Sequence, residues 1–306
     1  MKGHRTEMAT QVRKLKIIVT LTVVISLAIV ILVPSLMMPA ITSEAETGGT
    51  PLSIQDLSAV PQSIVDDAAR LATELFGNDQ RECHDFINQL LATYVVAKDK
   101  DIVMFFNSGG WGWTLIGDSP EAQSFVTGIE SELASLGYTS LMLDHNRTDD
   151  TLNGRLSELM LAVGLYPLKA KDLASRVEFL TSHIPGIKVI LTGASNGTLI
   201  CESVMNILGD TTQVYSIQLG PPFWSNSIVS DRSLIMRSNG IVPDSFSQGD
   251  LLMIIRASLE SLFGISHDDA GHILLHVGAP GHDYQWRYPQ VRSQIISFLQ
   301  QNFGLK

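Results

Sequence analysis

From residue 101 to the end of the chain, short apolar runs alternate with longer segments whose apolar residues recur at helical spacing. The short runs predict strands at 101–107, 139–144, 188–193, 214–220, 233–238 and 272–278. The segments between them predict helices at 119–136, 151–183, 197–208, 248–263 and 288–303. Strands separated by helices pair in parallel through right-handed crossovers. Residues 101–306 are therefore predicted to form an α/β domain, in which helices cover both faces of a mainly parallel sheet.

Two helices are predicted ahead of this domain, because apolar residues recur at helical spacing in 61–76 and 79–97. Gly77 lies between the two runs, where a helix C-terminus commonly carries glycine. Together the two helices make a short helical extension over residues 61–100.

A long uncharged stretch precedes the extension: IIVTLTVVISLAIVILV at 17–33, followed by further apolar residues up to 42. A helix of this length spans the roughly 30 Å of hydrocarbon in a bilayer. Five Lys and Arg residues lie in 1–16, and no other appears until Arg70. By the positive-inside bias, the sequence predicts a single-pass membrane protein. Residues 1–16 would be cytoplasmic, 17–42 a transmembrane signal anchor, and the C-terminal domain extracytoplasmic.

A cleaved signal peptide is the competing interpretation of this stretch, because Ser43 and Ala45 offer small residues for a cleavage site. The apolar core is longer than the roughly 7–15 residues usual in signal peptides, which favours the uncleaved anchor. Residues 43–60 mix Ser, Thr, Gly and Pro with acidic residues. They are predicted to form a linker between the anchor and the folded part.

The charge balance excludes one class of partner. The chain has 21 Lys and Arg against 31 Asp and Glu, a net charge of −10. Because five of the basic residues lie in 1–16, the part beyond the anchor is more acidic still. Phosphate backbones repel such a surface, so we expect no nucleic acid among the partners.

The chain has only two cysteines, Cys83 and Cys201. Two cysteines make no disulfide framework, and Cys201 lies in an apolar run of helical spacing. Although an exported domain permits a pair, two buried thiols are expected.

The motif with the clearest chemical meaning is GASNG, from Gly193 to Gly197, between a predicted strand and a predicted helix. A strand that reverses at once into a helix strains the middle residue, and glycine on either side avoids collisions. The hydroxyl of Ser195 is then presented at the carboxyl edge of the sheet, beside a helix N-terminus that favours an anion. Ser195 is therefore the predicted nucleophile, and a helix N-cap is the alternative interpretation.

An oxyanion site is expected in NSGGWG at 107–112, directly after the first predicted strand. Glycine lets the backbone approach a substrate closely, so the N–H groups of Gly110 and Asn196 are the predicted donors. An ordinary glycine-rich turn explains the same composition. The position on a central strand, ahead of the serine in the chain, favours the oxyanion site.

The predicted general base is His282, which follows the last predicted strand and a Gly-Ala-Pro-Gly loop. An acid that orients this histidine should follow the strand at 233–238. Asp244 is the residue chosen, because a carboxylate stabilises an imidazolium by charge. Asn239 and Asp231 are the alternatives. Asn239 stands closer to the strand end but is uncharged, and Asp231 lies beyond the preceding strand.

Over residues 101–306 these motifs resemble the α/β-hydrolase superfamily of serine esterases and lipases. GASNG matches its nucleophile elbow, NSGGWG its oxyanion loop and GHDYQW its histidine loop. The resemblance implies a serine hydrolase that cleaves a carboxylic ester, thioester or amide through an acyl-enzyme on Ser195. It implies a small-molecule or lipid-like ester as substrate, and neither a cofactor nor a metal.

The chain departs from the superfamily pattern at three places. Ser108 stands where a histidine is usual, and helices precede the first strand where many members have a β-hairpin. Asn239 stands where the acid is expected. This last departure motivates an alternative function, a catalytically weak or inactive hydrolase-like module that binds at the membrane surface.

A metal-dependent enzyme is a further alternative, because SHDDAGHILLH at 266–276 is rich in metal-ligand side chains. Gly271 interrupts any helix that would align them, and their spacing matches no recognised ligand motif. The side chains concerned are His267, Asp268, Asp269, His272 and His276.

Five aromatic residues fall near the predicted carboxyl-edge loops, where they either line an apolar acyl pocket or are simply buried. They are Trp111, Trp113, Phe223, Trp224 and Trp286.

Overall fold

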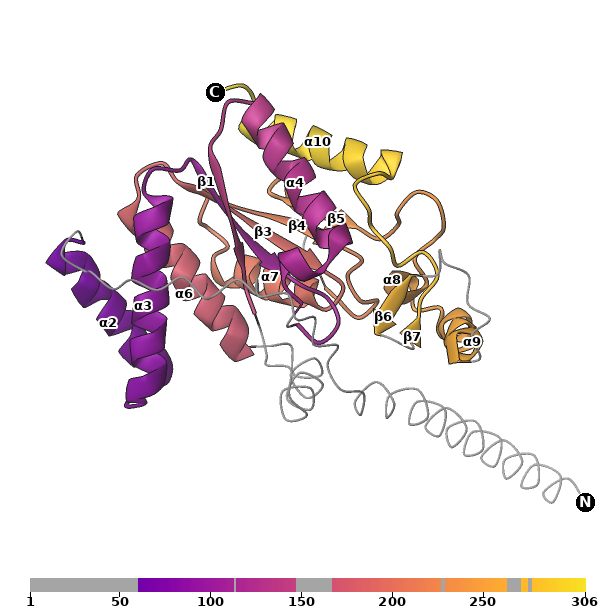
Figure 1. The fold of residues 1–306 in the computed structure, drawn as a ribbon, viewed down its shortest axis with the longest axis horizontal. Coiled ribbons are helices and arrows are strands. Elements are labelled where there is room, and N and C mark those ends of the chain that lie inside the picture. Colours follow the sequence, from indigo (N-terminus) through magenta and orange to yellow (C-terminus); the bar gives the residue numbers. More distant parts are fainter. Residues whose placement is uncertain (1–59, 113, 147–166, 227–228, 263–270, 275–276) are drawn as a thin grey trace, which may run out of the picture.

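Five parallel strands form the central sheet of the computed structural model, which describes residues 60–112, 114–146, 167–226, 229–262, 271–274 and 277–306 (Figure 1). The order across the sheet is β2-β1-β3-β4-β5. The bounds are β1 Ile102–Asn107, β2 Ser140–Asp144, β3 Lys188–Ala194, β4 Val214–Leu219 and β5 Ser233–Met236. Because every pairing in this sheet is parallel, the carboxyl ends of all its strands share one edge.

Helices cover both faces of the sheet, which confirms the predicted α/β fold (Figure 1). Their bounds are α2 Gln62–Phe76, α3 Gln80–Ala97, α4 Pro120–Ser135, α6 Pro167–His183, α7 Gly197–Ile207, α8 Ser245–Gln248, α9 Leu251–Leu262 and α10 Pro289–Phe303. Helices α2, α3, α6 and α7 share one core, and α4 and α10 share the other.

Strand β1 shows how one segment serves both cores. Its six residues are all buried. Val103 and Phe105 belong to the core under α6 and α7, whereas Ile102, Met104 and Phe106 belong to the core under α4 and α10. Successive side chains along a strand point to opposite faces, so a strand covered on both sides is apolar at every position.

The strand predicted at 272–278 is wrong as a member of the main sheet. The segment forms two short strands, β6 His272–Leu274 and β7 Val277–Gly278, which pair antiparallel in a separate sheet. Strand β7 packs on α9, where the backbone N–H of Gly278 donates to Oγ of Ser258 at 3.1 Å. A tertiary contact with a helix decides this pairing, and an apolar run does not encode such a contact.

Several predictions concern residues outside the described ranges. These are the basic N-terminus at 1–16, the anchor at 17–42, the linker up to residue 59 and the 151–166 part of a predicted helix. Within the described ranges, no helix combines the length and the apolar character needed to cross a membrane.

Neither Cys83 nor Cys201 is part of a disulfide bond. Cys201 is buried on α7, and its Sγ lies 3.7 Å from Nδ2 of Asn107. Cys83 on α3 is half-buried, so the expectation of two buried thiols holds fully for only one of them.

Candidate active site

Ser195 stands at the corner between β3, which ends at Ala194, and α7, which begins at Gly197. Its φ angle is 52°, and no other non-glycine residue in the described part of the chain has a positive φ. Such a conformation costs roughly 1–3 kcal/mol, and strain of this kind gathers at functional sites. The corner therefore has the strained geometry that the G-x-S-x-G pattern predicts.

Close packing explains why residue 197 is a glycine. A Cβ on Gly197 would lie 2.1 Å from the carbonyl oxygen of Asn107 and 2.7 Å from that of Ser108. Without a side chain here, the end of β1 can approach the start of α7. This approach brings the segment after β1 next to the serine, since a Cβ on Gly109 would lie 3.0 Å from Cβ of Ser195.

His282 and Asp244 are joined by a hydrogen bond of 2.9 Å between Nδ1 of the histidine and Oδ2 of the carboxylate. Asp244 follows β5 and is the N-cap of α8, whereas His282 lies in the loop between β7 and α10. The two side chains are 0% and 5% exposed, respectively. The bond orients the imidazole and directs Nε2 away from the carboxylate, as in a nucleophile–histidine–acid triad.

The Asp244 carboxylate accepts five hydrogen bonds from described residues. Oδ1 accepts from the backbone N–H groups of Phe246 and Ser247, which is the N-cap pattern. Oδ2 accepts from His282, from the hydroxyl of Tyr284 at 2.7 Å and from that of Ser247 at 2.9 Å. Burial alone would raise the pKa of Asp244. The hydrogen bond and charge of His282, helped by Ser247 and Tyr284, instead hold this pKa below its ordinary value.

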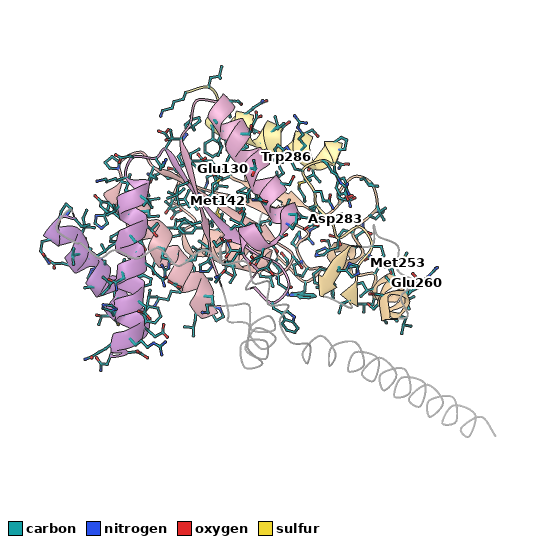
Figure 2. All side chains as sticks on the ribbon, in the orientation of Figure 1. Glu130, Met142, Met253, Glu260, Asp283 and Trp286 are labelled. Atoms are coloured by element: carbon teal, nitrogen blue, oxygen red, sulfur yellow. The ribbon has the colours of Figure 1, made fainter. Side chains whose placement is uncertain are left out.

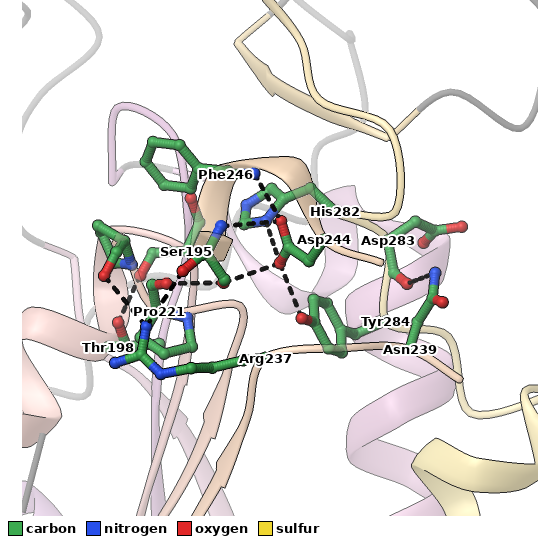
Figure 3. Close-up of polar contacts among 12 residues, drawn as sticks. Ser195, Thr198, Pro221, Arg237, Asn239, Asp244, Phe246, His282, Asp283 and Tyr284 are labelled. Carbon is green, nitrogen blue, oxygen red and sulfur yellow. Dashed lines mark hydrogen bonds and ion pairs between the residues drawn. The ribbon is translucent and has the colours of Figure 1, made fainter. Parts of the chain in front are cut away.

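The histidine ring reaches the edge of the sheet beside the serine. The backbone N–H of Ser195 donates to the carbonyl of Leu219 at 2.8 Å, which joins the corner to the end of β4. The next residue, Gly220, contacts the imidazole, because a Cβ there would lie 2.7 Å from Cε1 of His282. Figure 3 shows Ser195, His282 and Asp244 in one group, with Tyr284 beside Asp244.

The hydroxyl of Ser195 is buried at this edge of the sheet. Its Oγ is closed off from solvent and makes no hydrogen bond among the described residues. Oδ1 of Asn196 is likewise buried and without a partner there. A displayed hydroxyl was expected, and the structure differs in this respect. Two buried polar atoms that lack partners among the described residues make this corner a candidate site, where water or a ligand would complete the hydrogen bonding.

Two backbone N–H groups at the corner are available to an anion. Among the described residues, neither Gly110 nor Asn196 donates a backbone hydrogen bond. Gly110 has a φ of 57°, which favours glycine at this position. Asn196 directly precedes α7, whose N-terminus contributes positive potential. These are the two donors that the sequence predicts for an oxyanion.

Asn239, one alternative for the acid, makes its hydrogen bonds elsewhere. Its Oδ1 accepts from the backbone N–H groups of Ile241 and Val242, at 2.9 and 3.0 Å. Its Nδ2 donates to the carbonyl of Asp283 at 2.9 Å (Figure 3). Asn239 therefore ties the loop after β5 to the loop that carries His282, and does not itself bond to the imidazole.

Asp231, the other alternative, lies at the opposite edge of the sheet. It is exposed and lies two residues before β5, whereas Asp244 follows that strand. The structure thus brings one of the three candidate acids, Asp244, into a hydrogen bond with His282.

Tyr284 and Ser247 contact the carboxylate and were missed by the sequence analysis. Burial and the nearby charge of Asp244 raise the pKa of Tyr284 well above its ordinary value, so the hydroxyl stays neutral and donates. The one sequence signal for Tyr284 is its i, i+2 spacing from His282, which places two side chains on one side of an extended segment. Ser247 has a signal as well, since it is the third residue after an N-cap Asp.

One of the five aromatic residues named above packs against a helix-covered core. Trp286 belongs to the core under α4 and α10, and Figure 2 shows it beside α4. Trp111 is half-buried, and Trp113 lies outside the described ranges.

The other two aromatic residues form a chain of ring contacts that ends on the histidine. Phe223 and Trp224 follow β4 and are 46% and 40% exposed. The ring of Trp224 contacts Phe246, with centroids 5.4 Å apart, and Phe246 contacts His282 at 5.0 Å. The exposed ring of Trp224 is therefore separated from the imidazole of His282 by a single side chain, that of Phe246.

The metal alternative falls mostly on residues that the structure does not describe. His267, Asp268, Asp269 and His276 lie outside the described ranges, and His272 begins β6 as an exposed side chain. In the described part of the chain, no three His, Cys, Asp or Glu side chains are grouped as metal ligands.

No protein-family model matches the chain, and no curated protein sequence matches it. Among solved structures, it is similar to a Trichoderma reesei cutinase in complex with a phosphonate inhibitor. That match has 11% identity and a TM-score of 0.39, and covers 79% of this chain and 94% of the cutinase. It is also similar to the Lac repressor bound to ONPG, with 11% identity and a TM-score of 0.27, over 83% of this chain and 62% of the repressor. Such low TM-scores do not assign the chain to a family.

Proposed function

We propose that the chain is a serine hydrolase of the esterase type, built on an α/β-hydrolase-like fold, with Ser195, His282 and Asp244 as its catalytic triad. The observation that carries the proposal is the buried hydrogen bond between Nδ1 of His282 and an ionised Asp244, close to a serine with strained φ. A buried carboxylate that orients a histidine beside a strained serine is the arrangement that nucleophilic acyl transfer requires.

In the first half of the reaction, Oγ of Ser195 attacks the acyl carbon of the substrate. Nε2 of His282 accepts the hydroxyl proton, and the resulting imidazolium is stabilised by the charge of Asp244. The tetrahedral oxyanion accepts hydrogen bonds from the backbone N–H groups of Gly110 and Asn196. When the C–O bond to the leaving group breaks, His282 returns the proton to the departing alkoxide, and Ser195 carries the acyl group.

In the second half, water takes the place of the alcohol. His282 accepts a proton from the water as it attacks the acyl-enzyme, and the same donors stabilise the second oxyanion. The proton then passes to Oγ of Ser195 as the carboxylic acid departs. The proposed cycle uses water and groups of this chain, and a thioester or an amide would follow the same steps.

We extend the proposal to location and substrate. The uncharged segment at 17–42 would anchor the chain in a membrane with 1–16 in the cytoplasm and the hydrolase domain outside it. The substrate would be a small-molecule or lipid-like ester, and the acidic charge balance disfavours nucleic acid.

The test is turnover of p-nitrophenyl esters of increasing acyl length by the full chain. Ser195→Ala should lower kcat/KM by at least about 10⁴-fold, because the acyl-enzyme cannot form. Ser245→Ala is the matched control. Oγ of Ser245 is also buried without a partner among the described residues, so its removal breaks no hydrogen bond there. Equal turnover of Ser195→Ala and the wild type would refute the proposal.

One observation favours a second candidate function. Oγ of Ser195 is closed off from solvent and makes no hydrogen bond with a described residue, as in a hydrolase-like module that binds without turnover. A well-folded wild-type protein that turns over no ester, but whose thermal unfolding temperature rises with long-chain fatty acids, would support the binding module.

A further inference from the structure

Exposed apolar side chains are concentrated in one stretch of the sequence. Twelve large hydrophobic side chains are exposed in the described part of the chain, and eight of these lie between residues 223 and 253. The eight are Phe223, Trp224, Val229, Ile241, Val242, Leu251, Leu252 and Met253. Scattered single hydrophobic residues are ordinary, whereas a group of this kind marks an interaction surface.

Most of this group borders the proposed active site. Phe223 lies against the segment before α9, since a Cβ on Gly249 would be 3.1 Å from its ring. Trp224 reaches His282 through Phe246, as described above. The carbonyl oxygen of Val242 is packed against the loop of His282 at Gly281. We call the exposed residues of 223–224, 241–242 and 251–253 the apolar rim.

The apolar rim has almost no charge. The segments 221–226, 239–243 and 249–253 contain one charged residue, Asp250. Its carboxylate accepts a hydrogen bond from the backbone N–H of Met253 at 3.1 Å. The nearest basic side chain on α9, Arg256, is already paired with Glu260 at 2.9 Å, so a protein partner selected by charge or an anionic membrane finds little unpaired charge at the rim. The rim is suited to a surface that is itself neutral.

The rest of the chain indicates which neutral surface is within reach. The uncharged segment at 17–42 has the length of a bilayer-spanning helix, and 17 residues separate it from Val60, where the described part begins. A chain of that length extends to at most about 60 Å. A domain attached in this way stays within a protein's diameter of the membrane.

We propose that the apolar rim docks on the surface of a neutral lipid bilayer, so that the active site draws an acyl ester from that surface. The assignment of substrate rests on the proposed hydrolase function, whereas the docking does not. The aromatic contacts from Trp224 to His282 place the docked surface next to the catalytic histidine.

The test uses the full chain in vesicles of phosphatidylcholine that contain a fraction of phosphatidylcholine with a photoactivatable acyl chain. After illumination, mass spectrometry locates the residues that carry lipid. We expect lipid on Phe223, Trp224 and 251–253. Ile207 and Leu305 are the internal controls, because they are 53% and 85% exposed but lie at the C-terminal ends of α7 and α10, at the opposite edge of the sheet, and they should remain unlabelled.

Paired substitutions sharpen the test. Leu252→Asp with Met253→Asp should reduce lipid labelling of the rim at least about fivefold, since charged groups oppose entry into the acyl region. Ile207→Asp with Leu305→Asp is the matched pair, at the opposite edge of the sheet, and should leave the labelling of the rim intact. Labelling confined to 17–42, or equal labelling of rim and controls, would overturn the docking. An unlabelled rim in a full chain that sediments as a dimer would overturn it in favour of self-association.

The labelling requires no turnover, so the two proposals can fail separately. Rim labelling without ester hydrolysis would leave the docking in place and refute the hydrolase. Hydrolysis that depends on Ser195, without labelling of the rim, would support the hydrolase and refute the docking.

Discussion

Two carboxylates at opposite edges of the sheet both have a lowered pKa, for different reasons. Asp101 directly precedes β1, and the hydrogen bond from Lys306, followed by the backbone N–H of Thr139, lowers its pKa to about 2. It is partly exposed, and its partner Lys306 is half exposed. Asp244 at the carboxyl edge is fully buried, and its hydrogen-bond donors have to overcome a burial that raises its pKa.

This difference separates a structural carboxylate from a proposed catalytic one. Water solvates Asp101 if its partner is lost, so the pair resembles other surface ion pairs and adds little stability. The charge of Asp244 exists in a buried site only because several donors converge on it, and one of them is a histidine. A buried charge that is maintained next to an imidazole is what a triad needs.

Among the variants that compare the two edges, the largest effect is expected from Asp244→Asn. The variant keeps the size of the side chain but removes the charge that stabilises protonated His282, so kcat/KM should fall by roughly 10³–10⁴-fold. Asp231→Asn, on the other side of β5, is the control and should turn over esters at the wild-type rate. If Asp231→Asn turned over esters more slowly than Asp244→Asn, the assignment of Asp244 as the acid would be wrong.

A smaller loss is expected from Asn239→Ala. The carbonyl of Asp283 and the N–H groups of Ile241 and Val242 would lose their partner, and the loop of His282 would shift. We expect turnover to fall roughly 10- to 100-fold, because small displacements of a catalytic group are costly. Asn302→Ala, which removes an amide bonded to a carbonyl of α10, is the control. Equal effects of the two variants on turnover would reduce Asn239 to a general stabilising role.

Tyr284→Phe should act on the pKa of Asp244. Without this donor the folded-state pKa rises toward the ordinary value of 3.8. A lowered carboxylate pKa contributes stability above the unfolded-state pKa, and this stability is lost as the pH falls through the folded-state pKa. The variant should therefore begin to unfold at a higher pH than the wild type during acid titration, and turn over esters several-fold more slowly. Tyr288→Phe is the control, because it loses a hydrogen bond to Asp283 instead. It should leave the pH at which acid unfolding begins unchanged.

The smallest effect is expected from Asp101→Asn. Loss of the pair with Lys306 should change the free energy of unfolding at neutral pH by less than about 1 kcal/mol. It should leave ester turnover unaltered. Chemical denaturation at pH 7 measures the first quantity. A loss of activity in this variant would remove the distinction between the two edges.

The regular part of the fold could be predicted because its signals are local. All five main-sheet strands were predicted from apolar runs, and the end of β1 and the start of α7 were placed within one residue. The corner at Ser195 was predictable as well, since its strain follows from a turn without a loop. Strands β6 and β7 were not, because their pairing depends on the packing of Gly278 against α9.

The site was predictable to the extent that chain order reveals it. The order of Ser195, Asp244 and His282 along strand ends pointed to one edge, but the choice between Asp244 and Asn239 depended on how a loop folds. The structure shows Asp244 at the N-terminus of α8. This helix has four residues, which are too few to give a periodic pattern in the sequence. The converging hydroxyls of Ser247 and Tyr284 come from two loops, and their meeting is a tertiary property.

The most direct measurement of the central claim is to locate the adduct that a fluorophosphonate forms with the full chain. If Ser195 is the nucleophile that His282 and Asp244 activate, intact mass should show one adduct, and peptide mapping should place it on Ser195. His282→Ala should form it far more slowly. No adduct on a folded protein, or an adduct on another serine, would contradict the account.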